Sequence, residues 1–153
     1  MKISIKPGSI LKSSKGAAAV FLVWEGSKPS GELKEADGKL GGIVAKLEKA
    51  GEFKGAGGSS KVLPTFGRLP CDKIILIGMG KKETLESAYI AGCDLARAMK
   101  HSKVSRVSIG LDLDGAKARE FLLGALNADH EYSLKVKYAK PAPKLELTLG
   151  GSV

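Results

Sequence analysis

Residues 74–77 form the stretch that decides the fold: Ile74-Ile75-Leu76-Ile77. A second stretch of the same kind covers residues 17–24: Ala17-Ala18-Ala19-Val20-Phe21-Leu22-Val23-Trp24. Neither alternates apolar with polar residues, so a strand formed by either has no face suited to water. Such strands occur in sheets that helices cover on both faces. The sequence therefore predicts an α/β fold, a three-layer α/β/α sandwich with a mixed, mostly parallel sheet in which these two strands are central.

Three segments have the apolar spacing of helices. The first follows Asp37, a predicted N-cap, with apolar residues at positions 40, 43, 44 and 47. The second begins near Thr84 and ends at His101, and the third begins at Asp114. Shorter strands are predicted at residues 1–5, 61–64, 107–111, 134–138 and 145–149.

Length and composition describe one globular domain. The chain has 153 residues, of which 43% are hydrophobic, and this is enough to bury a single core. We expect one domain over residues 1–149 and a tail at 150–153. No apolar run approaches the roughly 18 residues of a membrane span, and the N-terminus lacks the apolar core of a signal peptide. Cys71 and Cys93 lack the short spacing of a metal site, so a cytoplasmic protein without membrane contact is the expectation.

The net charge of +9 comes almost entirely from lysine. Proteins that recognise nucleic acids usually combine arginine with aromatic side chains on which bases stack. Arginine occurs at only four positions and aromatic residues make up 5% of the chain. The charge therefore favours a solvated lysine surface over nucleic-acid binding, and weak binding of polyanions or DNA stays an alternative.

Candidate catalytic and metal-binding residues are few. His101 and His130, the two imidazoles, have no second ligand at helical spacing, so they do not indicate a metal site. Asp112 and Asp114 follow a predicted strand and have oxygens that a divalent cation accepts. A cap at the third helix is the favoured interpretation of Asp114. We therefore predict no catalytic residue, no metal ligand and no cofactor in this chain.

A glycine turn gives one candidate anion site, formed by Gly78, Gly80, Lys81 and Lys82. The turn lies between a buried strand and a helix N-terminus, where free backbone N–H groups can bind phosphate. Neither phosphate-binding glycine motif is complete, because Glu83 occupies the position of the third glycine. The alternative is a tight turn that needs small residues.

Several segments, in their order along the chain, resemble the N-terminal domain of the leucyl (cytosol) aminopeptidase family. They are the strand 17–24, Ser30-Gly31-Glu32-Leu33, Ala50-Gly51-Glu52-Phe53-Lys54-Gly55, Val62-Leu63-Pro64-Thr65, Phe66-Gly67-Arg68-Leu69-Pro70, the stretch 73–82 and Glu120-Phe121-Leu122-Leu123-Gly124-Ala125. The resemblance covers nearly the whole chain.

This resemblance implies a macro-domain-like fold and an accessory role. Members of the family are two-domain metallo-aminopeptidases that assemble as hexamers, with two divalent metals, zinc or manganese, held in a C-terminal domain. That domain carries an Asn-Thr-Asp-Ala-Glu-Gly-Arg signature, which this sequence lacks. The resemblance therefore implies that this chain alone is no enzyme and that its partners are a catalytic C-terminal domain and sister subunits. The alternative is a small-molecule module of macro type that binds an ADP-ribose-like ligand.

Overall fold

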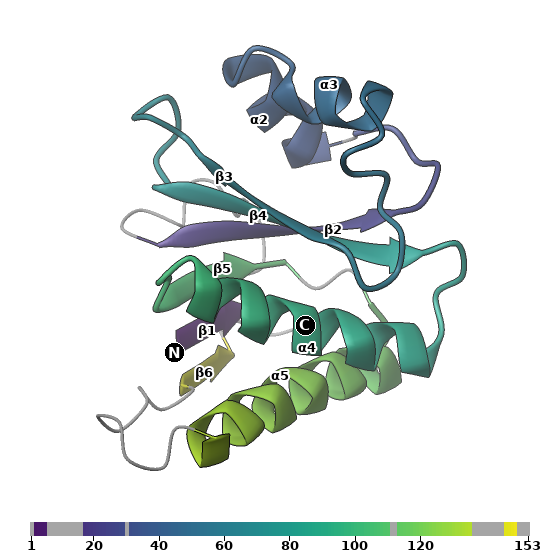
Figure 1. The fold of residues 1–153 in the computed structure, drawn as a ribbon, viewed down its shortest axis with the longest axis vertical. Coiled ribbons are helices and arrows are strands. Elements are labelled where there is room, and N and C mark those ends of the chain that lie inside the picture. The colour runs from purple at the N-terminus through teal and green to yellow at the C-terminus, as the bar shows by residue number, and fades with distance from the viewer. Residues whose placement is uncertain (1, 6–16, 30, 111–112, 136–145, 150–153) are drawn as a thin grey trace.

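The computed structural model describes residues 2–5, 17–29, 31–110, 113–135 and 146–149, and it contains a six-stranded sheet (Figure 1). The strands are β1 (Lys2–Ile5), β2 (Ala18–Trp24), β3 (Ser60–Pro64), β4 (Lys73–Gly80), β5 (Arg106–Ile109) and β6 (Glu146–Leu149). Their order across the sheet is β3-β4-β2-β5-β1-β6. All neighbours are parallel except the antiparallel pair β3–β4. The prediction of a mixed, mostly parallel sheet with β2 and β4 inside it is confirmed.

Helices cover the sheet on both faces, as the uninterrupted apolar strands require. Helices α2 (Gly31–Lys39) and α3 (Ile43–Lys49) lie on one face, and α4 (Leu85–His101) and α5 (Gly115–Lys135) lie on the other (Figure 1). Successive residues of β4 enter different layers of the core. Ile75 and Ile77 are fully buried under α4 and α5, whereas Ile74 and Leu76 are fully buried on the face of α2 and α3.

The segment around Asp37 differs from the prediction. It forms two helices. Asp37 lies inside the first of them, α2, and does not precede a helix as its N-cap residue. The chain breaks between the helices because Gly41 and Gly42 have φ of 77° and 76°, a left-handed conformation that glycine adopts without strain. Asp37 nevertheless caps a helix, since its carboxylate accepts hydrogen bonds from the N–H of Val44 at 2.7 Å and of Ala45 at 3.4 Å in α3.

The third predicted helix is longer than expected. Helix α5 continues to Lys135, so the strand predicted at residues 134–138 is wrong for its first two positions, and the other three lie outside the described residues. The apolar–polar alternation there is too short to outweigh continuation of a helix already packed on α4. The last predicted strand is confirmed as β6. The predicted helix start at Thr84 is also confirmed, because its hydroxyl accepts a hydrogen bond from the Ser87 N–H at 3.0 Å.

Replacing Asp37 with alanine is expected to lower the free energy of unfolding by about 1–2 kcal/mol, the usual cost of losing a helix cap. The carboxylate is buried, and without it the N–H groups of Val44 and Ala45 lose their acceptor. Urea unfolding would measure the change. Asp37→Asn keeps an acceptor oxygen and should lose clearly less. Equal losses in the two variants would contradict the capping role.

Candidate binding site at the carboxyl edge of the sheet

The parallel strands β2, β4 and β5 end at the same edge of the sheet, at Trp24, Gly80 and Ile109. From this edge the chain leaves β2 toward α2 on one face and leaves β4 toward α4 on the opposite face (Figure 1). Neighbouring strands that lead to opposite faces define a switch point, which is where open α/β sheets usually bind ligands. The topology therefore favours a ligand site at the switch point between β2 and β4.

Backbone segments of the chain itself fill the switch point. The N–H of Glu25, just after β2, donates to the carbonyl oxygen of Gly80 at 3.0 Å. The N–H of Gly80 donates to the carbonyl of Gly55 at 2.9 Å, and the N–H of Gly78 donates to that of Ser59 at 2.8 Å. The loop of residues 55–59 thus takes up the backbone donors that an anion would need.

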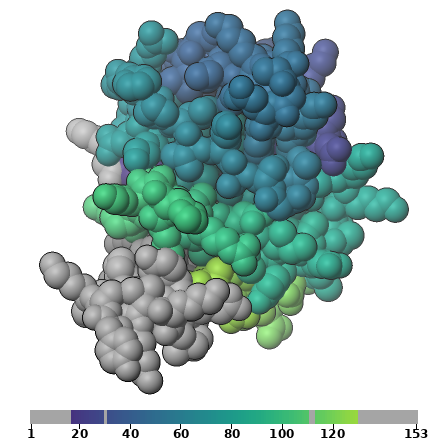
Figure 2. All heavy atoms as spheres, in the orientation of Figure 1, coloured from purple at the N-terminus to yellow at the C-terminus, as the bar shows by residue number. Residues whose placement is uncertain are grey.

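The glycines in this region allow close backbone approach. A Cβ on Gly78 would overlap the carbonyl oxygen of Ala56, and one on Gly55 would lie 2.9 Å from the backbone carbonyl of Trp24. Gly80 has φ of 81°, which glycine tolerates and other residues rarely adopt. These contacts require small residues, as the alternative interpretation expected, but Gly78 and Gly80 lie in the last part of β4 and not in a turn after the strand. In the space-filling view of Figure 2, atoms of α2, α3 and the segment that follows them form one continuous part of the visible surface.

The four residues of the predicted anion site therefore fall into two groups, the two glycines and the two lysines. Gly78 and Gly80 pack against the 55–59 loop, and their N–H groups are already hydrogen-bonded. Lys81 and Lys82 are exposed just after β4 and remain available for contact with an anion. The anion site stays a prediction that rests on these two lysines.

A small charged cluster lies near the same edge, formed by Glu83, Asp114 and Lys117. The Asp114 carboxylate accepts a hydrogen bond from the N–H of Lys117 at 3.0 Å, which supports its interpretation as a cap of α5. The Lys117 Nζ lies 3.2 Å from Asp114 Oδ2 and 3.5 Å from Glu83 Oε1. The backbone and side-chain hydrogen bonds from Lys117 lower the pKa of Asp114, and these carboxylates hold the pKa of Lys117 above its usual range. Asp112 lies outside the described residues.

Within the part of the chain that the structure describes, the two cysteines and His101 form no further site. Cys71 is buried, and the Cys93 thiol donates to the Gly124 carbonyl oxygen at 3.3 Å, as expected of packing residues. His101 is exposed at the end of α4. Among the residues described, no group of three or more His, Cys, Asp or Glu side chains could hold a metal ion. Over the same residues, no helix is both long and apolar enough to cross a bilayer.

Residues 20–134 match the N-terminal domain of the cytosol aminopeptidase family. A probable cytosol aminopeptidase from Rippkaea orientalis is 36% identical over 125 residues, which are 76% of this chain and 26% of that protein. A second one, from Alkaliphilus oremlandii, is 35% identical over 118 residues, with 73% and 23% covered. The chain therefore spans about a quarter of the curated relatives that it matches.

Two solved structures show the same fold at low sequence identity. The macrodomain of Mycobacterium tuberculosis DarG superimposes with a TM-score of 0.66 at 16% identity, covering 96% of this chain and 95% of that one. A tomato leucine aminopeptidase mutant superimposes with a TM-score of 0.66 at 20% identity, covering 97% of this chain and 32% of that one. The predicted macro-domain-like fold is confirmed.

Proposed function

The chain belongs to the cytosol aminopeptidase family, whose N-terminal domain it matches, and we propose that it serves as the non-catalytic accessory domain of such a metallopeptidase. The observation that carries the proposal is the match over residues 20–134, which includes β4, β2 from Val20 onward, and all four described helices almost to the end of α5. The relatives extend well beyond the part matched here. In this proposal residues 1–149 form one domain, and peptide hydrolysis belongs to a separate catalytic domain in the cytoplasm.

The proposed partners are that catalytic domain, with its two zinc or manganese ions, and sister subunits of a hexamer. Exposed apolar side chains give the accessory domain surfaces for such contacts. Phe66 is 86% exposed and has φ of 50°, an unusual conformation for a bulky residue. Exposed apolar side chains also occur along α4 and α5, at Leu85, Ile90, Leu123 and Leu126.

A small-molecule module of macro type is the second candidate function, and its support is the structural likeness to macrodomains. The switch point weighs against it, because the 55–59 loop fills the crevice and uses its N–H donors. A titration of the chain with ADP-ribose, followed by calorimetry, would separate the two functions. Micromolar binding would favour the module, and the accessory role predicts none. Polyanion binding rests only on the charge of +9 and would disappear as salt is raised.

We expect the purified chain to hydrolyse no aminoacyl amide, with or without added zinc or manganese. Metal-assisted hydrolysis needs several ligands that hold the ion beside an activated water, and the described residues offer no such group. Release of p-nitroaniline from leucine p-nitroanilide is the measurement, with a full-length relative as the positive control. Metal-dependent turnover that Asp114→Ala abolishes would overturn the expectation.

The native gene product offers a direct test of the accessory role. Mass spectrometry of the protein from its source should find a longer polypeptide whose downstream part contains the family's metal-binding signature. A native product that ends with this chain and works without a catalytic partner would refute the proposal.

A further inference from the structure

The turn that follows β3 presents Phe66 to solvent. Phe66 is 86% exposed, and Leu85, the next large apolar residue among those described, is 51% exposed. Phe66 and Gly67 have φ of 50° and 78°, and a hydrogen bond of 3.0 Å from the Arg68 N–H to the Thr65 carbonyl oxygen closes the turn. Positive φ at both central residues identifies a type I′ turn, whose first central position favours asparagine, aspartate or glycine. Phenylalanine at this position therefore adds backbone strain and gains no burial.

The fold does not explain why this strained position carries an aromatic side chain. Lys103 is the other non-glycine residue with positive φ among those described, at 58°. It follows α4, and its N–H donates to the carbonyl oxygen of Lys100 at 3.2 Å, so its conformation serves to end the helix. Phe66 ends no helix, and its turn would close equally well with asparagine. An exposed, strained residue that adds nothing to the fold points to a role in binding.

The base of the turn is held firmly by buried groups. The Thr65 N–H donates to the carbonyl oxygen of Asp72 at 3.1 Å, and the Thr65 hydroxyl donates to that of Cys71 at 2.6 Å. Thr65, Leu69 and Cys71 are all buried. The exposed ring therefore stands on a fixed support, and covering it costs little conformational freedom. Aromatic side chains presented in this way often contribute most of the binding energy of an interface.

Arg68 adds a positive charge beside the ring. It is exposed, and no ion pair of 4.0 Å or less involves it within the described part of the chain. Its guanidinium lies next to the break between α2 and α3, because a Cβ on Gly41 would be 3.9 Å from Nη1. Arginine, like the aromatic residues, is enriched where interfaces bind most strongly. A matching surface therefore has an apolar pocket for the ring and a carboxylate for the guanidinium.

We infer that Phe66 and Arg68 anchor this domain on the catalytic domain, where the ring enters an apolar pocket with an acidic rim. The inference rests on the proposed function. The matched residues make up 26% and 23% of the two relatives, so most of each relative lies outside the match and needs a surface to pack on. The turn precedes β4, whereas the switch point lies at the other end of that strand. Docking at the turn therefore leaves the carboxyl edge of the sheet uncovered.

Two variants test whether the ring serves the fold or a partner. In the 153-residue chain, Phe66→Asn should leave the urea midpoint unchanged or raise it, because asparagine accepts positive φ. In the native full-length product, hydrogen exchange of residues 65–69 should be slower than in the chain alone. Phe66→Asn should weaken docking by roughly 30-fold, as loss of an interface anchor does, and remove most of this protection. Phe66→Leu, which keeps an apolar side chain, should remove less of it. A lower urea midpoint of Phe66→Asn in the chain alone would show that the ring supports the fold and would overturn the inference.

Photo-crosslinking of the native full-length product identifies the partner surface. Phe66→p-benzoylphenylalanine keeps an aromatic ring, and after illumination mass spectrometry should find it attached to residues of the catalytic domain. The same replacement at Lys103 is the matched control, because Lys103 is exposed and shares the positive φ, and it should give few such products. Attachment to a second copy of this domain, or to no protein residue, would refute the inference and leave the proposed function standing. A native product without a catalytic domain would refute both.

Discussion

Replacing Gly92 with alanine is expected to destabilise the chain by about 3 kcal/mol, although alanine is the better helix former. Gly92 lies in α4 where this helix crosses α5. A Cβ on Gly92 would overlap the carbonyl oxygen of Phe121 and lie 2.9 Å from the backbone nitrogen of Ala125. Gly124 makes the same close approach from α5, since its Cβ would overlap the carbonyl oxygen of Tyr89.

Two opposing effects decide the sign of this change. Alanine gains about 1 kcal/mol over glycine in a helix interior. Overpacking costs about 1–3 kcal/mol or more, and here it is at its upper end because both obstacles are backbone atoms that cannot rotate away. The helices must separate along their whole contact, so fully buried Leu95 and Phe121 lose packing as well. The clash therefore outweighs the gain in helix propensity.

Urea unfolding of Gly92→Ala and of Gly38→Ala would separate the cost of overpacking from the gain in helix propensity. Gly38 also lies inside a helix, α2, but a Cβ there would meet no atom within 4 Å. Gly38→Ala should therefore raise stability by up to about 1 kcal/mol. If Gly92→Ala were as stable as the unchanged chain, α4 and α5 would not cross as closely as described.

The central strands β2 and β4 and helix α4 could be predicted because their apolar patterns agree with the side chains that the fold buries. Residues 74–77 are apolar throughout and fully buried between the two helical layers, and most of the apolar positions after Thr84 lie on the buried side of α4. Helix α2 was not predicted from the sequence because it has few apolar residues. Leu33 and Ala36 hold it against the sheet, and the rest of the helix is polar or glycine. Tertiary burial, rather than local pattern, stabilises such a helix.

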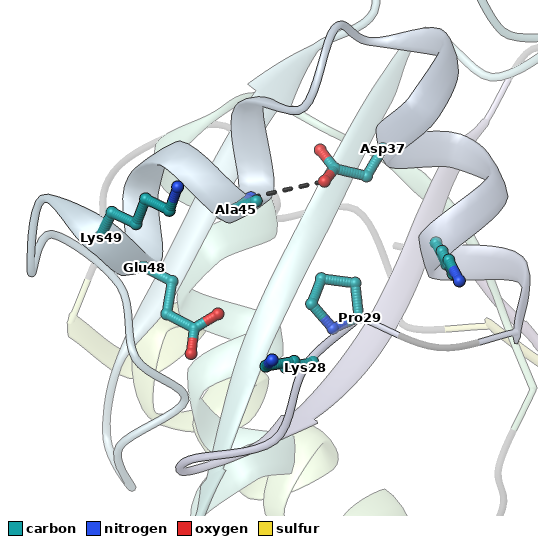
Figure 3. A pocket seen from close by; sticks show the side chains of 7 residues that line it. Lys28, Pro29, Asp37, Ala45, Glu48 and Lys49 are labelled. Carbon is teal, nitrogen blue, oxygen red and sulfur yellow. Dashed lines mark hydrogen bonds between the residues drawn. The ribbon is translucent and has the colours of Figure 1, made fainter.

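The candidate sites depended on contacts between distant segments, which a local pattern does not contain. The sequence singled out Gly78 and Gly80 correctly as special positions, but it could not show that Gly55 and Ser59 accept their hydrogen bonds. A hollow of about 580 Å³, shown in Figure 3, combines side chains of the loop after β2 with those of α2 and α3 and has no motif of its own. By contrast, Asp114 was predictable as a cap because its bond to Lys117 is local.

Replacing Gly78 with alanine should detach the 55–59 loop from β4 and lower the free energy of unfolding by about 2–3 kcal/mol. The new Cβ would overlap the carbonyl oxygen of Ala56, so the loop or the strand must move. The strand is held on both sides by β2 and β3, and the loop therefore moves. Its displacement breaks the hydrogen bonds of Gly78 to Ser59 and of Gly80 to Gly55, at about 1 kcal/mol each, and the remaining loss is packing.

Hydrogen exchange and limited proteolysis would locate this effect. The N–H groups of Gly78 and Gly80 should exchange faster and residues 55–59 should become cleavable, while α4 and α5 keep their protection. Gly57→Ala is the matched control in the same loop, because its Cβ would have only ordinary contact with Gly80 at 3.9 Å. Unchanged exchange at Gly78 and Gly80 in Gly78→Ala would mean that the loop does not fill the switch point. That outcome would remove the main structural argument against a ligand of macro type at this edge.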